Sequence, residues 1–353
     1  MSAFVERCDA RDFRDEILSL FDRNGQARSG QHFDWYYGRN GNATALSWML
    51  RGSAERAIAG LCSVVPRTFR FGDRLVRAGV VGDLMLDAEH RGIGGLALLR
   101  SVQSLVSNKQ FDILLGMPTL AAPRRLVLRM GFRTIAAWQT YVQIFRSRAA
   151  LLVRYGTAGA ALSPLVDLIA GLRRRFSAFR EGSVPNLRLE ELTCDQVTRL
   201  PVESWPPLDG RLIADLPPTT LETRFLRQPL ENYRLIGIVH RLDNSIRGYL
   251  VVDCQRGRVI VCHCHTDARM LSELEAILAL CRYGRRYGET FGVITLRGSK
   301  LSSVLERSGF IPLPPKFGGS GNSLLGFWRP DHPLARYFER PACWNVFPGF
   351  SDV

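Results

Sequence analysis

Residues 80–106 constrain the fold of this chain more than any other stretch, because three local patterns follow one another without a gap. Val80, Val81 and Leu84–Leu86 form an apolar run of the length expected for a buried strand. Gly92, Gly94 and Gly95 follow, as expected where the backbone turns sharply or another group comes close. Apolar residues then recur at helical spacing, at Leu96, Leu99, Val102, Leu105 and Val106. The pattern predicts a strand, a glycine loop and a helix.

A glycine loop that opens a helix favours a bound anion. It presents unpaired backbone N–H groups and the positive end of the helix dipole, which together suit a phosphate. Arg91 adds a positive charge beside the loop. The loop lacks the Gly-x-Gly-x-x-Gly pattern of dinucleotide folds and the Gly-Lys-Ser/Thr of a Walker loop. The alternative is an ordinary strand–helix unit with a glycine turn.

The loop resembles the coenzyme A pyrophosphate loop of the Gcn5-related N-acetyltransferase (GNAT) superfamily. Residues 91–96 match the Arg and the first Gly of that family's Arg/Gln-x-x-Gly-x-Gly/Ala signature, with Leu96 at the last small position. Residues 111–118 look like the family's fifth strand, and Met130-Gly131-Phe132 looks like its entry to the last strands. The resemblance implies a mixed α/β sheet and acyl-CoA or acetyl-CoA as the donor, with no metal. The donor-binding residues that it implies are Leu84, Met85, Leu86, Arg91, Gly92, Ile93, Gly94 and Gly95.

The length of 353 residues predicts two domains. Ser308-Gly309-Phe310 repeats the earlier Met130-Gly131-Phe132, which suggests that one domain was duplicated. We therefore expect two GNAT-like domains in tandem, at residues 1–148 and 186–353, joined by a basic amphipathic linker at 149–185. The second copy has no glycine in residues 265–269, where the first has its loop. It should be degenerate and should not hold coenzyme A as the first does.

The charge of +14 favours an anionic partner. Nucleic acid is not expected, because no nucleic-acid motif is present. Within residues 149–180, apolar side chains fall near one helical face and Arg173–Arg175 follow, which predicts docking on an anionic membrane surface. A helical linker packed across the two domains is the alternative. The first residues have no apolar signal core, and no apolar run is long enough to span a bilayer. We expect a cytoplasmic protein, or one peripheral to the inner membrane.

Transfer of an acyl group from a thioester to an amine needs two aids. A backbone N–H near Leu86 would polarise the thioester carbonyl, and a base would take a proton from the amine. The candidate bases near the loop are Asp83, Asp87, Glu89 and His90. Asp83 is favoured as the catalytic base because a carboxylate among apolar residues is costly unless it is used or paired. The alternative is a structural carboxylate paired with an arginine.

The run Cys262-His263-Cys264-His265 invites a metal interpretation. Side chains alternate along a strand, so the cysteines and the histidines should face opposite sides, and no single ion could meet all four. We expect no metal site. His263 or His265 could instead reach the catalytic groove from the second copy, and burial in the core is the alternative for both.

These observations support three functional hypotheses. The first is an acyl-CoA-dependent N-acyltransferase that transfers a long-chain acyl group to a membrane-associated lipid amine, because the layout is similar to that of bacterial ceramide synthases, which acylate a sphingoid-type base. The second is an N-acetyltransferase acting on an amino sugar or nucleotide sugar in polysaccharide biosynthesis. The third is a catalytically inactive module that binds nucleic acid, which no motif supports.

Overall fold

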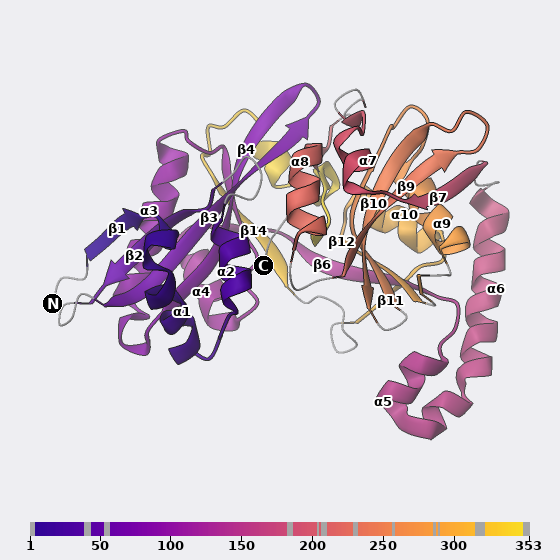
Figure 1. The fold of residues 1–353 in the computed structure, drawn as a ribbon, viewed down its shortest axis with the longest axis horizontal. Coiled ribbons are helices and arrows are strands. Elements are labelled where there is room, and N and C mark those ends of the chain that lie inside the picture. The colour runs from indigo at the N-terminus through magenta and orange to yellow at the C-terminus, as the bar shows by residue number, and fades with distance from the viewer. Residues whose placement is uncertain are drawn as a thin grey trace.

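The computed structural model shows two halves side by side, with a pair of helices extending from the edge of the second (Figure 1). The structure describes residues 4–38, 44–52, 57–181, 186–202, 205, 210–228, 232–255, 258–284, 287, 288, 290–314 and 322–348. We call residues 148–181 the arm. The residues before and after the arm are the N-terminal half and the C-terminal half.

The N-terminal half contains the predicted strand–loop–helix unit. Its elements are β1 (Phe4–Cys8), η1 (Ala10–Phe13), α1 (Arg14–Arg23), α2 (Gly30–Tyr37), β2 (Leu46–Arg51), β3 (Ile58–Phe71), β4 (Arg74–Leu86), η2 (Ala88–His90), α3 (Ile93–Ser107), β5 (Ile113–Gly116), α4 (Ala121–Arg129) and β6 (Arg133–Ile144). The strand predicted from its apolar run is the end of β4, and the helix predicted from its spacing is α3. Both predictions are confirmed.

The arm and the C-terminal half follow in the same chain order. The arm consists of α5 (Arg148–Ala161) and α6 (Ser163–Glu181). The C-terminal half contains β7 (Leu187–Glu191), α7 (Cys194–Thr198), β8 (Leu212–Ala214), α8 (Pro218–Leu221), η4 (Glu222–Leu226), β9 (Tyr233–His240), β10 (Ile246–Gln255), β11 (Arg258–Thr266), α9 (Glu273–Tyr283), β12 (Thr290–Leu296), α10 (Lys300–Arg307), β13 (Ile311–Pro312), β14 (Ser323–Trp328), α11 (Ala335–Phe338), η6 (Pro341–Cys343) and β15 (Trp344–Asn345).

One mixed sheet runs through both halves, in the order β1-β2-β3-β4-β5-β14-β6-β12-β11-β10-β9-β7. β4 and β5 pair in parallel, whereas β3 and β4, and β14 and β5, pair antiparallel. A parallel pair needs a crossover connection, which α3 supplies between β4 and β5. The predicted α/β class with a mixed sheet is confirmed.

The two halves exchange strands at their junction. β14, from the C-terminal half, lies between β5 and β6. The first part of β6 pairs with β14, and its later part, from Trp138 to Ile144, pairs with β12. β6 therefore takes part in the sheet of both halves. The division into residues 1–148, 149–185 and 186–353 stays a prediction, since neither half has all its sheet neighbours without the other.

Helices cover both faces of the N-terminal sheet. α3 packs on one face with its apolar stripe, which includes the fully buried Leu98, Leu99 and Val102. α1 and α2 cover the opposite face through Ile17, Phe21 and the aromatic residues of α2. The aromatic residues Phe33, Tyr36 and Tyr37 of α2 are therefore part of the core. The end of β4 lies between these two layers, which we call the α3 layer and the α1–α2 layer.

Candidate functional site

The candidate site lies where β4 and β5 part. Their pairing runs from Ala78 opposite Ile113 to Val81 opposite Gly116, where β5 ends. β4 continues to Leu86 and keeps β3 as its partner on the other side. Among the described strands, none pairs with residues 82–86 along one edge. We call this stretch the open edge of β4.

A β-bulge accounts for the divergence of the two strands. Leu61 of β3 pairs with Met85, but Ser63 pairs with Gly82, so β4 contains an extra residue here. Asp83, within the bulge, has a φ of 48°. A bulge bends its strand and increases the local twist, which turns the end of β4 away from β5. The periodicity of the sequence gave no signal for this bulge.

The backbone of Leu86 faces the open edge. The N–H of Asp87 donates to the carbonyl of Ala59 in β3 at 2.9 Å. Because backbone groups alternate along a strand, those of Leu86 point to the opposite edge. There the Leu86 carbonyl accepts from Arg91 Nε at 3.3 Å. The predicted position of the Leu86 N–H, beside an approaching thioester, is compatible with this geometry.

The side chains of the three implied donor-binding residues of β4 divide between the two layers. Leu84 and Leu86 pack into the α3 layer, and Met85 packs against the α1–α2 layer. Their contribution to a ligand at the open edge would therefore come from the backbone.

The start of α3 presents free backbone donors. Gly92 is the N-cap residue and makes no side-chain cap, and the first turn of α3 contains no acidic residue. The first helical hydrogen bond runs from Leu96 N to Gly92 O. Within the described part of the chain, the N–H groups of Ile93, Gly94 and Gly95 have no acceptor. Together with the helix dipole they form a site that suits a diphosphate.

The loop glycines fall into two kinds. A Cβ on Gly94 would stand 2.6 Å from Leu50 Cδ2, and one on Gly95 would stand 2.8 Å from Leu126 Cδ2. These two glycines therefore let α3 pack closely. A Cβ on Gly92 would meet nothing within 4 Å. Among the described residues, Gly92 therefore leaves open space beside the exposed Ile93, next to the free N–H groups of the helix start.

Gly116, at the end of β5, also borders open space. It is buried, yet a Cβ there would meet no atom of the described residues within 4 Å. Side chains alternate along a strand, so Gly116 shares the α3 face with Leu114. Empty space at a buried strand position, next to the parting of β4 and β5, is compatible with room for a narrow ligand arm.

Hydrogen bonds fix the loop to the end of α1. Asp87 accepts from Arg23 through both carboxylate oxygens at 2.9 Å and from Asn24 Nδ2 at 2.9 Å. Arg91 Nη2 donates to Asn24 Oδ1 at 3.1 Å, which holds its guanidinium near the start of α3. Burial raises the pKa of the Asp87 carboxyl, but the hydrogen bonds from Arg23 and Asn24 outweigh it, and the net pKa is lowered. Asp87 is thus placed as an anchor, and its predicted catalytic role remains untested.

Asp83 is held by two partners from the α1–α2 layer. Arg28 pairs with both of its oxygens, at 2.5 and 3.0 Å, and Tyr37 donates its hydroxyl to Oδ2 at 2.6 Å. The side chain of Asp83 is only 2% exposed. Burial raises the pKa of Tyr37 well above 10, and the Asp83 charge adds to this, so the phenol stays a donor. This is the paired arrangement that the sequence left as an alternative, and the role of Asp83 as a base stays a prediction.

His263 lies in the C-terminal half, on β11. It is 2% exposed and contacts the rings of Tyr249 and Phe347. Neither ring nitrogen has a hydrogen-bond partner among the described residues. Burial lowers the pKa of His263 well below 6.5, so the ring is neutral. The described contacts do not join it to the open edge of β4, and its predicted catalytic role remains untested.

The expected alternation of Cys262–His265 is wrong. Val251 pairs with His263 but Val252 pairs with Val261, so Cys262 is an extra residue in a bulge of β11. Cys262 and Cys264 consequently pack into different apolar clusters. In the described ranges, no three His, Cys, Asp or Glu side chains are placed to hold a metal ion.

The C-terminal half contains a similar strand–helix–strand unit, β11–α9–β12, whose helix start differs. β11 and β12 pair in parallel up to Val261 and Val293. Ser272 caps α9 and exchanges hydrogen bonds with Glu275. Glu273 is buried, pairs with Arg211 at 3.5 Å and accepts from Asn345 Nδ2. Two acidic residues at the start of this helix would repel a phosphate.

The chain's own C-terminal segment occupies the end of this second unit. Asn345 contacts Glu273 at the start of α9, and the carbonyl of Val346 accepts from Thr295 Oγ1 of β12 at 3.3 Å. Phe347 packs against His263 of β11. The segment thus lies where β11 and β12 part. This arrangement favours the expectation that the C-terminal half does not hold coenzyme A.

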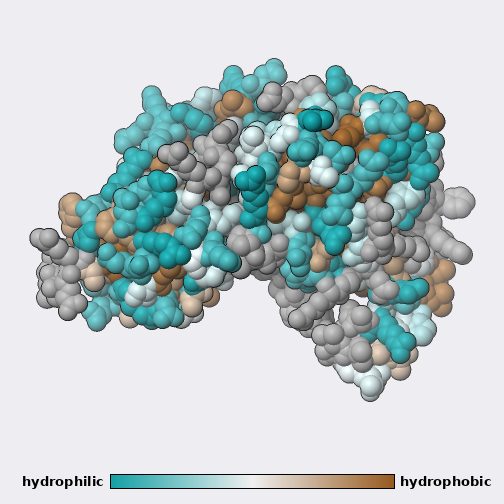
Figure 2. Space-filling model, viewed as in Figure 1, coloured by the Kyte–Doolittle hydropathy of each residue, from teal (hydrophilic) through white to brown (hydrophobic). Residues whose placement is uncertain are grey.

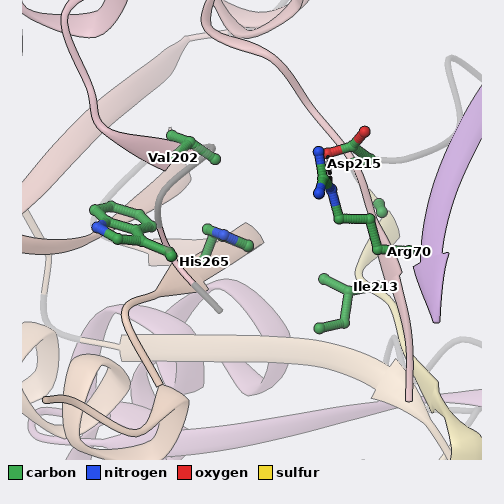
Figure 3. Close-up of a pocket in the computed structure, with 7 residues that line it drawn as sticks. Arg70, Val202, Ile213, Asp215 and His265 are labelled. Atoms are coloured by element: carbon green, nitrogen blue, oxygen red, sulfur yellow. Dashed lines mark hydrogen bonds and ion pairs between the residues drawn. The ribbon is translucent and has the colours of Figure 1, made fainter. Parts of the chain in front are cut away.

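A pocket lies at the far end of β3 (Figure 3). His265 and Val202 stand across it from Ile213 and from an ion pair between Arg70 Nε and Asp215 Oδ1, which are 2.9 Å apart. Trp205 stacks on His265 with ring centroids 5.3 Å apart. Arg70 is nine residues along β3 from Leu61, which spans about 30 Å of strand. The pocket is therefore separate from the open edge.

The two buried histidines predict how stability depends on pH. Burial lowers the pKa of His265 to about 4, with Arg70 lowering it further and Asp215 opposing. The unfolded chain binds a proton near pH 6.5, so this contribution to stability is present above that pH and is lost as the pH falls towards 4. The slope is about 1.4 kcal/mol per pH unit for each histidine.

His265→Gln should therefore flatten the acid side of the stability profile. We expect the free energy of unfolding, measured in urea at several pH values, to fall less steeply below pH 6.5 by about 1.4 kcal/mol per unit. Parallel profiles for the variant and the parent chain would contradict the assignment of a neutral buried His265.

Four residues of the site were not predicted from sequence. Arg28 and Tyr37 hold Asp83, and Asn24 contacts both Asp87 and Arg91. Gly116 borders the open space beside β5. Tyr37 lies in the aromatic run His32–Tyr37, which by itself gives no sign of an acidic partner. No local pattern identifies Arg28 or Asn24, because their partners are more than 50 residues away in sequence. The open space at Gly116 likewise depends on how distant segments pack.

The fold is that of known acyltransferase structures. No family model matches the chain, and no curated protein matches its sequence. A conserved protein of unknown function from Enterococcus faecalis V583, described as a "Probable N-Acyltransferase", matches with a TM-score of 0.60 and 8% identity, over 92% of this chain and 72% of that chain. A GCN5-related N-acetyltransferase from Anabaena variabilis matches with a TM-score of 0.58 and 12% identity, over 92% and 73%.

A eukaryotic structure matches as well. Saccharomyces cerevisiae N-myristoyltransferase with bound myristoyl-CoA has a TM-score of 0.54 and 13% identity, over 98% of this chain and 85% of that chain. At such identities the likeness is one of fold. The chain has the GNAT fold, as the glycine loop indicated.

Proposed function

We propose that this protein is an acyl-CoA-dependent N-acyltransferase, with its donor site in the N-terminal half. The observation that carries the proposal is the combination of the open edge of β4 with the free N–H groups at the start of α3. The diphosphate of the donor would bind Gly92–Gly95, with Arg91 beside it. The pantetheine arm would lie along the open edge, past Gly116.

The reaction mainly requires that the thioester carbonyl and the amine be held next to each other. The Leu86 N–H would donate to the thioester carbonyl and stabilise the negative charge that develops on its oxygen. The amine nitrogen forms the new C–N bond, the C–S bond breaks, and coenzyme A leaves as a thiolate. A base takes the proton lost by the amine. Asp83 is our proposed base, and Asp87 and His263 are less favoured by their contacts.

A long-chain donor and a lipid amine are the proposed substrates. The fold match to N-myristoyltransferase covers almost all of this chain, and that structure holds myristoyl-CoA. The similarity to bacterial ceramide synthases suggests a sphingoid-type base as the acceptor. We propose that the two halves are tandem GNAT-like units, the second degenerate, because its helix start carries acids where the first carries glycines.

One assay tests the proposal. The protein is incubated with acetyl-CoA or palmitoyl-CoA, against a sphingoid base or an amino sugar, and the release of free thiol is followed. We expect turnover with palmitoyl-CoA and the sphingoid base. Turnover with acetyl-CoA and the amino sugar would favour the polysaccharide alternative, and no thiol release with any pair would contradict the proposed reaction.

A further inference from the structure

The outer face of α6 is apolar, which is the reverse of an ordinary surface helix. Four large apolar residues along it are between 47% and 60% exposed, namely Leu165, Leu168, Ile169 and Leu172, and Leu162 just before the helix is 59% exposed. The inner positions Ser163, Val166, Asp167 and Ala170 are buried or half-buried. A surface helix normally turns its apolar stripe to the core and its polar residues to solvent. A contiguous exposed apolar stripe marks a docking surface.

The inner face of α6 is fixed, so the apolar face cannot turn inward. The N–H of Ser147 donates to Asp167 Oδ1 at 2.7 Å, and the Ser147 hydroxyl donates to the carbonyl of Ser163. These bonds connect the end of β6 to the first turns of α6. Figure 1 shows the arm extending beyond the body of the C-terminal half, and Figure 2 shows hydrophobic residues at its outer edge.

The charge of α6 decides between two possible occupants. Arg173, Arg174 and Arg175 follow the apolar stripe along the same helix, and the only acid before Glu181 is Asp167, which the Ser147 bond turns inward. A second copy of the chain would bring the same arginines and a charge of +14 towards this face. An anionic lipid headgroup complements it.

We propose that the arm docks on an anionic lipid bilayer through the outer face of α6. The four residues Leu165, Leu168, Ile169 and Leu172 enter the boundary between headgroups and acyl chains. The arginines of the following turn lie at the level of the headgroups. No helix in the described ranges is long and apolar enough to cross a membrane. The surface would bring a lipid acceptor to the proposed reaction.

Vesicle sedimentation tests the arm by itself, without donor or amine. The full chain is mixed with vesicles of phosphatidylcholine, alone or with about one third phosphatidylglycerol, a content at which an anionic surface attracts basic groups. We expect binding to the anionic vesicles and a loss of about 10-fold or more in Leu168→Ser/Ile169→Ser. The matched control is Leu75→Ser/Leu242→Ser, which removes two apolar residues outside the arm that are at least as exposed, at 60% and 78%. It should bind like the parent chain.

The arginines supply a second test. Arg173→Gln/Arg174→Gln/Arg175→Gln should lower binding to anionic vesicles and reduce its dependence on salt, because fewer charges are screened. The thermal unfolding midpoint of each variant is measured beside vesicle binding, so that a loss of binding counts only where the fold is intact; Leu168 and Ile169 are exposed, and their variant should unfold like the parent chain. Equal vesicle binding of Leu168→Ser/Ile169→Ser and of the control Leu75→Ser/Leu242→Ser would overturn the proposal. So would a concentration-dependent dimer that the arm substitutions abolish while vesicle binding persists.

The two proposals can fail independently. Vesicle binding without thiol release in the assay above would leave the docking surface standing and remove the reaction. Thiol release from palmitoyl-CoA with a detergent-dispersed sphingoid base, but no vesicle binding, would support the reaction and remove the docking surface.

Discussion

Gly116→Val should fold and lose acyl transfer by about 100-fold or more, the size of effect expected when a reacting group is displaced by about 1 Å. Gly116 has strand geometry, and a Cβ there meets no atom of the described residues within 4 Å, so a side chain can begin at this position without displacing them. In the proposed complex, however, the same space holds the pantetheine arm. The measurements are the turnover of palmitoyl-CoA and its dissociation constant, together with the thermal unfolding midpoint.

Gly79→Ala is the matched control for this prediction. Gly79 lies in the neighbouring β4, and a Cβ there would stand 2.6 Å from Val64 Cγ1 and 2.8 Å from Leu114 Cδ2. It should lower stability by about 1–3 kcal/mol through overpacking, with donor affinity retained in the folded fraction. If Gly116→Val bound palmitoyl-CoA as the parent chain does, the path of the donor past β5 would be wrong.

Asp83→Asn should have the largest effect on stability of any single substitution at the site. Asparagine tolerates the positive φ of this position, so the bulge itself can persist. The change leaves the guanidinium of Arg28, which is 21% exposed, without its carboxylate partner. Breaking a buried pair from one side costs about 3–5 kcal/mol, and the partial exposure of Arg28 places this case near 3 kcal/mol. Urea unfolding at neutral pH measures the loss.

Removing the second charge separates the two roles considered for Asp83. Asp83→Asn/Arg28→Met should regain most of the lost stability, because a pair replaced on both sides leaves no unpaired charge. If the double variant is stable but inactive, Asp83 acts as the base. If it is stable and active, Asp83 serves only to hold the bulge with Arg28 and Tyr37. A double variant no more stable than Asp83→Asn would contradict the pairing argument.

Local patterns predicted the local elements of the site well. The apolar run at 80–86 and the helical spacing after Gly95 correspond to β4 and α3, because each depends only on residues a few positions apart. The glycines also predicted the character of the helix start. Patterns at strand ends were less informative, since the bulges at Asp83 and Cys262 follow from pairing with a neighbouring strand.

The exposed apolar face of the arm illustrates the same limit. The spacing of Leu165, Leu168, Ile169 and Leu172 predicted an amphipathic helix, which α6 is. Periodicity gives the stripe but does not say whether it faces a core or solvent. That depends on what the rest of the chain places beside the helix.

The sequence by itself determined the strand, the glycine loop and the helix that open the candidate site, and through them the GNAT fold. Only the tertiary structure decided which partner holds Asp83, that β14 separates β5 from β6, and that a C-terminal segment fills the second unit. The reason is physical. Hydrogen bonds along a helix and the alternation of side chains along a strand depend on residues a few positions apart, so the sequence pattern predicts them. Strand order and ion pairs join residues far apart in sequence, and neither the helical nor the strand periodicity contains that information.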